Sequence, residues 1–547
     1  MILRAEIQEK TMGSKLLLKN LYLTLQPKQK IAIIGRNGVG KSTLLGLLNG
    51  EDEEYIGEIW RKKGLRIATS RQEHSEVGEM TVVSYVLSEL PGYEKLKNII
   101  DEYPAIGDPS EEQLNVYSDA LEHFAELDYY RAEENVLRAL DRYQIDETMA
   151  RGPLKKLSGG QKRFVELVKI AESNVDLALI DEPTNHMDYV AKAEFITWLI
   201  ATKGAVVLVS HDRDVLANVD MIIEIKDHKA VMFVGNYDAY LSQNGLATVA
   251  GMNTYEVQQK TMENLKKQLK EANRKKAGSS KNPNPFIPMV RRFEKQIAEL
   301  EKIMVKPSFW IDQQSVDSMP KKVADRYDKY KTQNITIDTD QTQAEFTNLL
   351  SVHELSIGYV DPLFTKVSFG LNSGGRVEIR GRNGAGKSSL IKFILESTKQ
   401  EPTEVKVFSG YVKPERGLRL GYYEQEISPS LLSKSLSYAI AEVYHENDID
   451  ISQEKIMQIA AQYLFDPRTD LQLKLSQLSG GQKARFQLIK MLCGQPNLLI
   501  LDEPTNHLDL PSIEELEKAL AEYSGAILYV SHDNYFREKL QGEIVQI

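Results

Sequence analysis

The chain of 547 residues contains a single cysteine, Cys493. One cysteine excludes an internal disulfide, and it excludes a four-thiolate zinc site or an iron–sulfur cluster built from this chain alone. No run approaches the roughly 18 consecutive apolar residues of a membrane helix. The opening segment, MILRAEIQEK, alternates like a strand and lacks the apolar block of a secretion signal. We therefore expect a cytoplasmic protein that has no membrane partner.

Basic residues are outnumbered over the whole chain, where 68 Lys and Arg face 78 Asp and Glu and the net charge is −10. Residues 256–331 reverse this balance, with 18 basic and 10 acidic side chains and a net charge of +8, which leaves −18 for the remainder. The total charge therefore hides a basic segment. Because domains usually hold roughly 100–200 residues, we also expect two or three domains.

Several short motifs occur twice and in the same order. The glycine-rich stretches GRNGVGKST and GRNGAGKSS begin at Gly35 and Gly381, and each follows an apolar run typical of a strand. LSGGQ, DEPTNH and SHD follow in both halves, and the second copy of each lies 321 residues after the first. A lone GxxxxGK[ST] is weak evidence, but an ordered set repeated at one spacing indicates a duplicated domain.

The glycine-rich stretches predict two phosphate-binding loops. Glycines let the backbone wrap closely around phosphates, so that N–H groups and the start of the next helix face the anion. A lysine then places positive charge at the β and γ phosphates, and the following serine offers a hydroxyl to Mg²⁺. The predicted nucleotide-binding residues of these loops are Gly35, Asn37, Gly38, Gly40, Lys41, Ser42 and Thr43, and Gly381, Asn383, Gly384, Gly386, Lys387, Ser388 and Ser389.

An Asp–Glu pair ends an apolar strand in each half. Asp181 and Asp502 are predicted to hold the Mg²⁺ shell together with Ser42 and Ser388 of the loops. Glu182 and Glu503 follow directly and are suited to the base that orients an attacking water. A solvated strand end is the alternative reading of one such pair, and the duplication makes it the weaker one.

Two further pairs complete the predicted catalytic set. His211 and His532 each end an apolar strand, where an imidazole can contact the γ phosphate and respond to its loss. Gln72 and Gln425 lie between the phosphate loop and LSGGQ, where they are either bridges between metal, water and the neighbouring domain or ordinary surface glutamines.

LSGGQ precedes a helical pattern in both halves and presents a second anion-binding helix start. One nucleotide site does not need two phosphate cradles, so we expect each LSGGQ to close on the ATP held by the other half. The chain would then be a monomer whose two halves close intramolecularly on ATP. The predicted residues are Ser158, Gly159, Gly160 and Gln161 for the second site, and Ser479, Gly480, Gly481 and Gln482 for the first.

These motifs resemble those of ATP-binding cassette proteins, and DEPTNHMD with DEPTNHLD resembles specifically the ABC-F family. GNYDAY, from Gly235 to Tyr240, is similar to that family's exit from the first cassette. The resemblance implies an α/β fold with two P-loop cassettes in tandem that hydrolyse Mg·ATP. Members of the family bind ribosomes near the tRNA exit site and act as translation factors, assembly factors or antibiotic-resistance proteins.

The resemblance also implies an aromatic side chain that stacks on adenine upstream of each phosphate loop. Tyr359 occupies that place in the second half, whereas Gly13 stands at the equivalent position of the first. The resemblance therefore gives no basis for base selectivity at the first site, whereas phosphate binding is expected there.

The basic segment is predicted to be an antiparallel helical hairpin. One helix should run from Tyr255 to about Lys276, and a second follows three prolines that cannot continue a helix. Their expected apolar faces are Val257, Met262, Leu265 and Leu269 on the first, and Phe293, Ile297, Leu300 and Met304 on the second.

Residues 260–295, around the expected tip, carry 11 basic and 3 acidic side chains, and the tip is expected to expose Phe286, Ile287, Met289 and Val290. Basic residues interleaved with apolar ones suit RNA, and a solvated spacer is the alternative. Family members use this connector to reach toward tRNA and the peptidyl-transferase centre. The predicted RNA-binding residues are Lys275, Lys276, Lys281, Phe286, Arg291 and Arg292.

The predicted domains are residues 1–242 for the first cassette, 243–346 for the hairpin linker and 347–547 for the second cassette. The first cassette carries about 32 extra residues, since Gln72 and Leu157 are separated by 85 residues and Gln425 and Leu478 by 53. This helical insertion, at about 85–150, lies where the family has a ribosome-contacting arm. Its acidity leaves ribosome contact and helical embellishment equally open.

The predicted function is that of an ATP-hydrolysing factor that associates with the ribosome, its rRNA and possible tRNA partners, and either modulates translation or confers resistance to ribosome-targeting antibiotics. The competing prediction is the tandem ATPase subunit of a membrane transporter, which shares the nucleotide motifs but seldom needs a basic hairpin. Chromosome or repair ATPases are a weaker third class, because their coiled coils lie inside a cassette or their zinc sites need more cysteines.

Overall fold

The computed structural model describes residues 1–13, 15–70, 77–105, 110–185, 187–279, 284–304, 316, 320–330, 348–399, 402, 404–424, 427–506 and 508–547. The chain forms two compact units. One contains Met1–Asn236 with Ile335–Ile547 and carries both copies of the repeated motifs, and the other is Tyr237–Asn334. Within the described ranges, no helix combines the length and the apolar character needed to span a bilayer.

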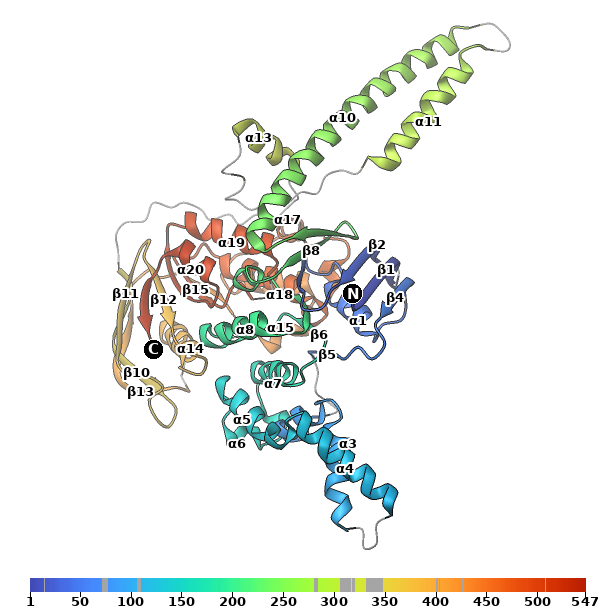
Figure 1. Ribbon diagram of the computed structural model, residues 1–547. Coiled ribbons are helices and arrows are strands. Elements are labelled where there is room, and N and C mark those ends of the chain that lie inside the picture. Colours follow the sequence, from blue (N-terminus) through green and yellow to red (C-terminus); the bar gives the residue numbers. More distant parts are fainter. Residues whose placement is uncertain are drawn as a thin grey trace. The chain divides into compact units, whose positions relative to one another are not determined.

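The first half of the larger unit is built on a six-stranded sheet of order β5-β6-β7-β3-β8-β9. Figure 1 labels β5, β6 and β8 of this sheet. Adjacent strands are parallel except for the β8–β9 hairpin. The inner strands are uninterrupted apolar runs that are almost wholly buried, as expected for a parallel sheet covered on both faces. The strands are β3 (Lys30–Gly35), β5 (Ile67–Thr69), β6 (Leu177–Asp181), β7 (Ala205–Val209), β8 (Met221–Lys226) and β9 (Lys229–Val234).

The second half repeats this topology with a parallel sheet of order β14-β15-β16-β12-β17. Its strands are β12 (Arg376–Arg380), β14 (Leu420–Tyr423), β15 (Leu498–Asp502), β16 (Ala526–Val530) and β17 (Glu543–Gln546). The order matches β5-β6-β7-β3-β8 of the first half, so the predicted α/β fold with two tandem cassettes is confirmed.

Each half also has a three-stranded antiparallel sheet, of order β2-β1-β4 in the first and β11-β10-β13 in the second. Alternating residues of β1 and β2 enter the core that also contains the helix after the phosphate loop. These strands are β1 (Leu3–Met12), β2 (Lys15–Leu25), β4 (Ile56–Arg61), β10 (Asn348–Gly358), β11 (Val367–Asn372) and β13 (Lys406–Pro414).

The helices begin at recognisable caps, most often a Ser, Thr or Asp side chain that accepts an N–H of the first turn. In the first half they are α1 (Lys41–Asn49), α2 (Val82–Ser88), α3 (Tyr93–Glu102), α4 (Glu111–Glu126), α5 (Ala132–Arg142), α6 (Glu147–Ala150), α7 (Gly159–Glu172), α8 (Tyr189–Ala201) and α9 (Arg213–Leu216). In the second half they are α14 (Lys387–Lys399), α15 (Pro429–Leu432), α16 (Leu436–His445), α17 (Gln453–Gln462), α18 (Gly480–Leu492), α19 (Leu510–Glu522) and α20 (Asn534–Leu540).

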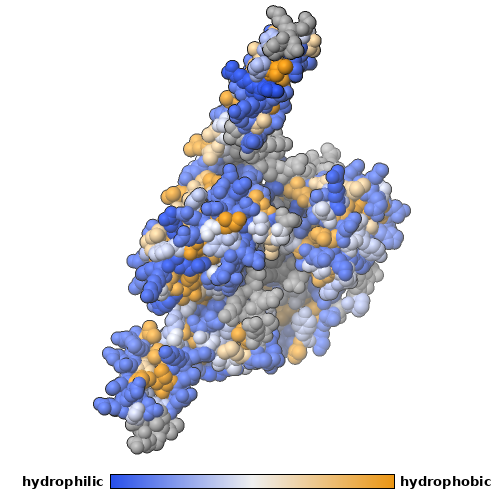
Figure 2. All heavy atoms as spheres, turned by 90° about the vertical axis from the view of Figure 1, so that its right-hand side faces the viewer, coloured by the Kyte–Doolittle hydropathy of each residue, from blue (hydrophilic) through white to orange (hydrophobic). Residues whose placement is uncertain are grey.

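The insertion of the first half contains the helical hairpin α3–α4. Aromatic rings hold it together: Tyr103 stacks on Tyr117 with centroids 4.0 Å apart, and Phe124 meets Tyr129 edge to face at 5.5 Å. Apolar side chains also gather on the visible face of the hairpin (Figure 2). The helical character predicted for the insertion is present in α3, α4 and α5.

The smaller unit is the connecting hairpin, made of α10 (Tyr237–Ala277), α11 (Ile287–Ile303) and α13 (Lys321–Tyr330). α10 and α11 are antiparallel, since Lys266 pairs with Glu301 at 3.8 Å and Asn284 Nδ2 donates to the Lys276 carbonyl at 2.8 Å. The helix predicted from Tyr255 is thus the later part of a 41-residue helix.

Two predicted exposures in this unit were wrong. Val257 is 64% exposed and lies off the apolar face, whose buried residues include Met252 and Tyr255 besides the predicted Met262. Val290 is buried at 3% exposure, and of the tip residues expected to be exposed only Met289 is fully so, because Phe286 and Ile287 are half-buried. The visible face of the hairpin is largely hydrophilic (Figure 2).

Candidate functional site

The first phosphate loop follows β3 and enters α1. Gly38 and Gly40 adopt positive φ angles of 77° and 103°, a conformation that side chains with a Cβ rarely take. The buried Lys41 folds back over the loop, and its Nζ donates to the carbonyls of Gly35 at 2.8 Å and Arg36 at 3.2 Å. The loop is therefore closed around the lysine, with backbone N–H groups and one positive charge available to an anion.

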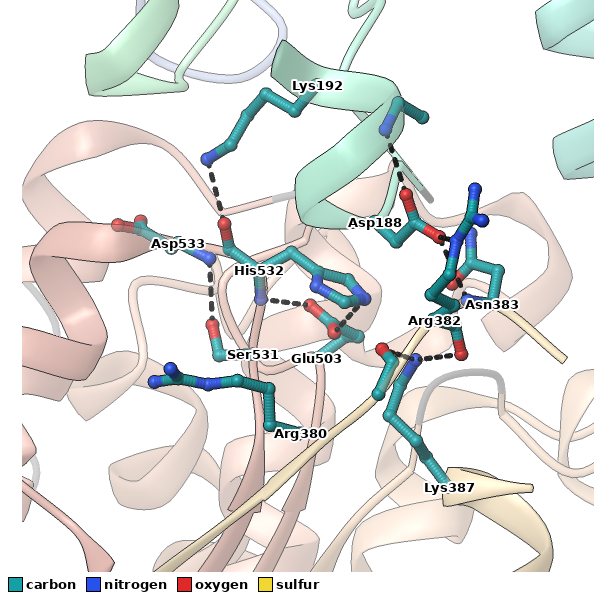
Figure 3. Close-up of polar contacts among 12 residues, drawn as sticks. Asp188, Lys192, Arg380, Arg382, Asn383, Lys387, Glu503, Ser531, His532 and Asp533 are labelled. Atoms are coloured by element: carbon teal, nitrogen blue, oxygen red, sulfur yellow. Dashed lines mark hydrogen bonds and ion pairs between the residues drawn. The ribbon is translucent and has the colours of Figure 1, made fainter. Parts of the chain in front are cut away.

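The second loop has the same construction between β12 and α14. Gly384 and Gly386 have φ angles of 80° and 97°, and the Nζ of Lys387 donates to the carbonyls of Gly381 at 2.9 Å and Arg382 at 3.0 Å. Figure 3 shows this lysine below the Asp188–Asn383 contact. The two predicted phosphate loops are thus equivalent in backbone geometry.

The predicted catalytic glutamates sit directly after β6 and β15. Both have left-handed backbones, with φ of 47° at Glu182 and 50° at Glu503, which is strained for a residue other than glycine and typical of functional positions. Burial raises the pKa of each carboxyl to about 7, and Lys41 or Lys387 opposes that rise. The Glu503 side chain is 9% exposed and that of Glu182 is 22% exposed.

The predicted histidines lie beside these glutamates. His211 Nε2 is 3.6 Å from Glu182 Oε1, and His532 Nε2 is 3.3 Å from Glu503 Oε1. The main-chain N–H of His532 also donates to Glu503 Oε2 at 3.2 Å. Burial, together with the nearby loop lysine, lowers the pKa of both imidazoles to about 3, so each is neutral at pH 7. In the described part of the chain neither ring nitrogen of His211 has a hydrogen-bond partner.

A cavity of about 770 Å³ lies over the first phosphate loop. Gly480 of the second half lines this cavity together with residues of the first half. A Cβ added to Gly481 would collide with the Asn37 side chain, so the second LSGGQ packs closely on the first phosphate loop. The lining residues include Asn37, Gly38, Gly40, Lys41, Ser42, Thr43, Asp181 and Glu182.

The serine and glutamine of each LSGGQ cap the helix that follows. Ser158 Oγ accepts the N–H of Gln161 at 3.2 Å, and Gln161 Oε1 accepts the N–H of Ser158 at 3.0 Å. Ser479 and Gln482 form the same reciprocal pair at 3.3 and 3.0 Å. These capping boxes fix the direction of the first turn of α7 and α18, which is the part predicted to face phosphate.

The two halves exchange one matched contact at each phosphate loop. Asp188, the cap of α8, accepts the N–H of Asn383 at 3.0 Å (Figure 3). Asp509, the cap of α19, accepts the N–H of Asn37 at 3.4 Å. Burial alone would raise the pKa of both carboxyls. At Asp188 the N–H groups of Ala191 and Asn383 outweigh it, and at Asp509 the Ser512 hydroxyl and nearby positive charge do so, so that both pKa values are lowered. Each phosphate loop therefore donates a main-chain hydrogen bond to the aspartate that ends the DEPTNH-containing motif of the other half.

The residues present fit Mg·ATP. Mg²⁺ takes oxygen ligands and keeps several waters. Ser388 hydrogen bonds to the Asp502 carboxyl, and Ser42 and Asp181 line one cavity. Each site therefore offers one hydroxyl and one carboxylate to the ion, beside a lysine and backbone N–H groups suited to phosphates. Bound Mg·ATP supplies the anhydride bond that hydrolysis breaks.

Tyr359 and Gly13, the residues at the predicted adenine ends of the two sites, have different surroundings. Tyr359 follows β10 and is 49% exposed, whereas Gly13 forms the turn between β1 and β2 with φ of 60° and has no side chain. Met12 and Lys15 line the first cavity beside that turn, and Lys15 Nζ donates to the Gly38 carbonyl at 3.2 Å.

Some predicted residues lie outside the described part of the chain. These are Gln72, Gln425 and Lys281. Of the other predicted RNA-binding residues, Lys275, Lys276, Arg291 and Arg292 are exposed on the hairpin and Phe286 is half-buried.

Sequence reasoning missed three residues of the site. Asp188 and Asp509 end the two DEPTNH-containing motifs but received no role, although their matched spacing was a usable signal. Arg163 lines the first cavity and donates to the Glu182 carbonyl at 3.0 Å, and nothing in the motif marks it.

Comparison with known proteins supports this architecture. The family model described as ABC transporter matches residues 18–185 and 364–506. YdiF from Bacillus subtilis is 31% identical over all of this chain and 80% of its own length, and the ABC transporter F family member 2 of Arabidopsis thaliana is 28% identical over 97% of this chain and 74% of its own.

Among solved structures, the archaeal ribosome recycling factor aABCE1, in complex with the ribosomal stalk protein aP1, has a TM-score of 0.54 at 15% identity. The match covers 98% of this chain and 86% of that one, and it shows a shared fold. Taken with the repeated loops, the acidic pairs and the matched family model, these findings show that the chain belongs to the ATP-binding cassette family, as a tandem-cassette ATPase of the ABC-F type that uses ATP with Mg²⁺.

Proposed function

We propose that this protein is an ATP-driven factor that binds the ribosome and reaches with its connecting hairpin toward the tRNA sites and the peptidyl-transferase centre. There it modulates translation or protects the ribosome from antibiotics. The long connector favours protection. Closure of the two cassettes on ATP permits binding, and hydrolysis releases the protein.

The site geometry gives each residue a role in this cycle. Glu182 and Glu503 orient the attacking water, and their strained backbones hold the carboxylates at the ends of the strands. The neutral imidazoles of His211 and His532 lie beside them. We infer that each would contact the γ phosphate of bound ATP and lose that contact after hydrolysis. Since Gly480 lines the first cavity from the other half, departure of that phosphate weakens the attraction between the halves.

The observation that carries the proposal is the basic tip of the hairpin. Residues 260–295 have a net charge of +8 in a chain whose total is −10. Mutual repulsion among clustered positive charges is unfavourable, and an anionic partner offsets it. Attraction to phosphates supplies a large part of the affinity of proteins for nucleic acids. The similar archaeal structure is described as a ribosome recycling factor bound to a ribosomal stalk protein, which supports a ribosomal target.

The decisive experiment uses the double variant Glu182→Gln/Glu503→Gln, which should bind ATP and hydrolyse it very slowly. We expect it to comigrate with ribosomes in a sucrose gradient with ATP and to leave them with ADP. The unmodified protein with ADP is the control. Failure of the double variant to enter the ribosomal fractions with ATP would contradict the proposal.

Neutralising the tip tests the RNA-binding role of its charges. Replacing Lys275, Lys276, Arg291 and Arg292 by Gln should weaken ribosome association. The slope of log association constant against log salt concentration should also become less steep, by about 0.7–0.9 for each phosphate that the variant no longer neutralises. A matched control removes four exposed charges from the first cassette, Lys19, Lys28, Lys62 and Lys63. Equal effects of the two variants would leave the hairpin as a spacer.

The second candidate is the ATPase subunit of a membrane transporter. It is favoured by the matching family model, which is described as ABC transporter. The same gradient separates the two, because a transporter subunit carrying Glu182→Gln/Glu503→Gln would fractionate with membranes and remain absent from the ribosomal peak.

A further inference from the structure

The two ATP sites differ at one position of the helices that follow the DEPTNH motifs. α8 and α19 begin after the equivalent caps Asp188 and Asp509. Four residues beyond these caps, the first half has Lys192 and the second has Ile513. Both side chains are buried, at 4% and 2% exposure, and both line one cavity between the halves. At this position, therefore, only the helix of the first half carries a charge.

Lys192 reaches across to the second ATP site. Its Nζ donates to the main-chain carbonyl of His532 at 2.8 Å, and Figure 3 shows this contact running from α8 to the histidine. The same ammonium lies 2.6 Å from Asp214 and 3.3 Å from Asp212, the residues that follow His211. A buried ammonium with three oxygen partners is held in one position.

Both main-chain polar groups of His532 are therefore hydrogen-bonded to charged side chains. Its N–H donates to Glu503 of its own half, and its carbonyl accepts from Lys192 of the other half. The equivalent of Lys192 beside the first site is Ile513, whose side chain carries no hydrogen-bond donor. The histidine-to-glutamate distance is 3.6 Å in the first site and 3.3 Å in the second.

The first site has a cation of its own, from its own half. Arg163 on α7 donates to the Glu182 carbonyl at 3.0 Å, and the residue at the repeat-equivalent position is Ala484. The second site receives its additional cation, Lys192, only when the halves are together. Two neighbouring contacts hold the halves in this arrangement: Arg213 pairs with Glu517 at 2.8 Å, and Asn534 Nδ2 donates to Asp214 at 2.8 Å.

We propose that Lys192 is a positioning residue that acts from the first cassette on the second ATP site. It fixes the main chain of His532, so that hydrolysis at the second site requires the closed arrangement of the two halves. The first site carries the corresponding cation within its own half. This inference rests on the catalytic roles given above to His532 and Glu503 and is independent of ribosome binding.

The test is ATP hydrolysis by purified protein without ribosomes. Lys192→Met is made in a Glu182→Gln background, in which only the second site is competent. Because small misplacements of catalytic groups cost up to about a hundred-fold, we expect kcat to fall at least about ten-fold. KM for ATP should stay within about two-fold, since the phosphate loop is untouched. Lys192→Arg, which keeps a positive charge and N–H donors for the His532 carbonyl, should restore part of kcat.

The matched control is Ile513→Met in a Glu503→Gln background, which should leave kcat of the first site unchanged. If Glu182→Gln alone abolishes hydrolysis, the two sites hydrolyse ATP only in concert. The ten-fold fall in kcat is then expected of Lys192→Met in the otherwise unmodified chain. The proposal is overturned by a kcat within two-fold of the parent protein. It is equally overturned if KM rises in step with the fall in kcat, or if Lys192→Arg is as slow as Lys192→Met.

Discussion

The two halves of the larger unit share one topology and one set of motifs, yet their ATP sites are not copies. The phosphate loops, the strained glutamates and the cap aspartates match in pairs. The surroundings do not match. Arg163 donates to the Glu182 carbonyl of its own half, whereas Lys192 donates to the His532 carbonyl of the opposite half. The groups predicted to contact nucleotide thus match between the halves, whereas the additional cation beside each site comes from a different part of the chain.

The largest expected effect concerns what the two sites share. Glu182→Gln/Glu503→Gln should lower ATP hydrolysis by about 10²–10⁴-fold, the usual contribution of a general base, while nucleotide binding is retained. Phosphate release and binding of a fluorescent ATP analogue measure the two quantities. The control replaces two exposed carboxylates, Glu126 and Glu538, by Gln. A double variant that still turns over at the parent rate would remove both glutamates from the mechanism.

The next effect concerns the buried ion pair of Arg213 with Glu517, which has no counterpart at the equivalent residue Asn534. Arg213→Ala leaves Glu517 buried without its charge partner, and breaking a buried pair in this way costs about 3–5 kcal/mol. Asn534, the repeat-equivalent of Arg213, is exposed, and Asn534→Ala should cost less than about 1 kcal/mol. Denaturant unfolding followed by circular dichroism measures both.

A double replacement sharpens that result. Arg213→Met/Glu517→Leu removes both charges and should be less destabilising than Arg213→Ala alone, because no buried charge is left unpaired. Equal destabilisation by Arg213→Ala and Asn534→Ala would mean that the buried pair contributes nothing particular to the interface.

The smallest effect concerns the adenine ends. Tyr359→Ala should weaken ATP binding at the second site by about two- to ten-fold, the range of about 0.5–1.5 kcal/mol for an aromatic stack, and should reduce the preference for ATP over GTP there. Tyr411→Ala, another exposed aromatic of the second half, is the control. An unchanged nucleotide preference would show that Tyr359 does not contact the base.

The sequence predicted the tandem α/β fold because its motifs are local and tied to backbone requirements. Positive-φ glycines, helix caps and buried strands each have a signature of a few residues. The exposed tip was mispredicted at Val290, although Val290, Phe293, Ile297 and Leu300 continue one helical stripe and the signal was available. Val257 was likewise two positions away from Tyr255 and therefore on another face.

The contacts that Lys192 and Arg213 make with the second half could not be predicted, because they join residues hundreds of positions apart. Nothing local to Lys192 indicates that it meets the carbonyl of His532, 340 residues later. The one available hint is a mismatch in the repeat, Lys192 against Ile513 and Arg213 against Asn534. Mismatches between the two copies of a duplicated sequence are thus one place to look for residues that connect the two halves.

The central claim is that both halves of one chain close on shared nucleotide, and cross-linking tests it most directly. Asp214→Cys and Asn534→Cys place two thiols where the halves exchange a hydrogen bond, and the native Cys493 is buried. In the Glu182→Gln/Glu503→Gln protein with Mg·ATP, we predict rapid cross-linking within a single chain and little with ADP. Cross-links that form only between two chains, or equally well without ATP, would contradict intramolecular closure.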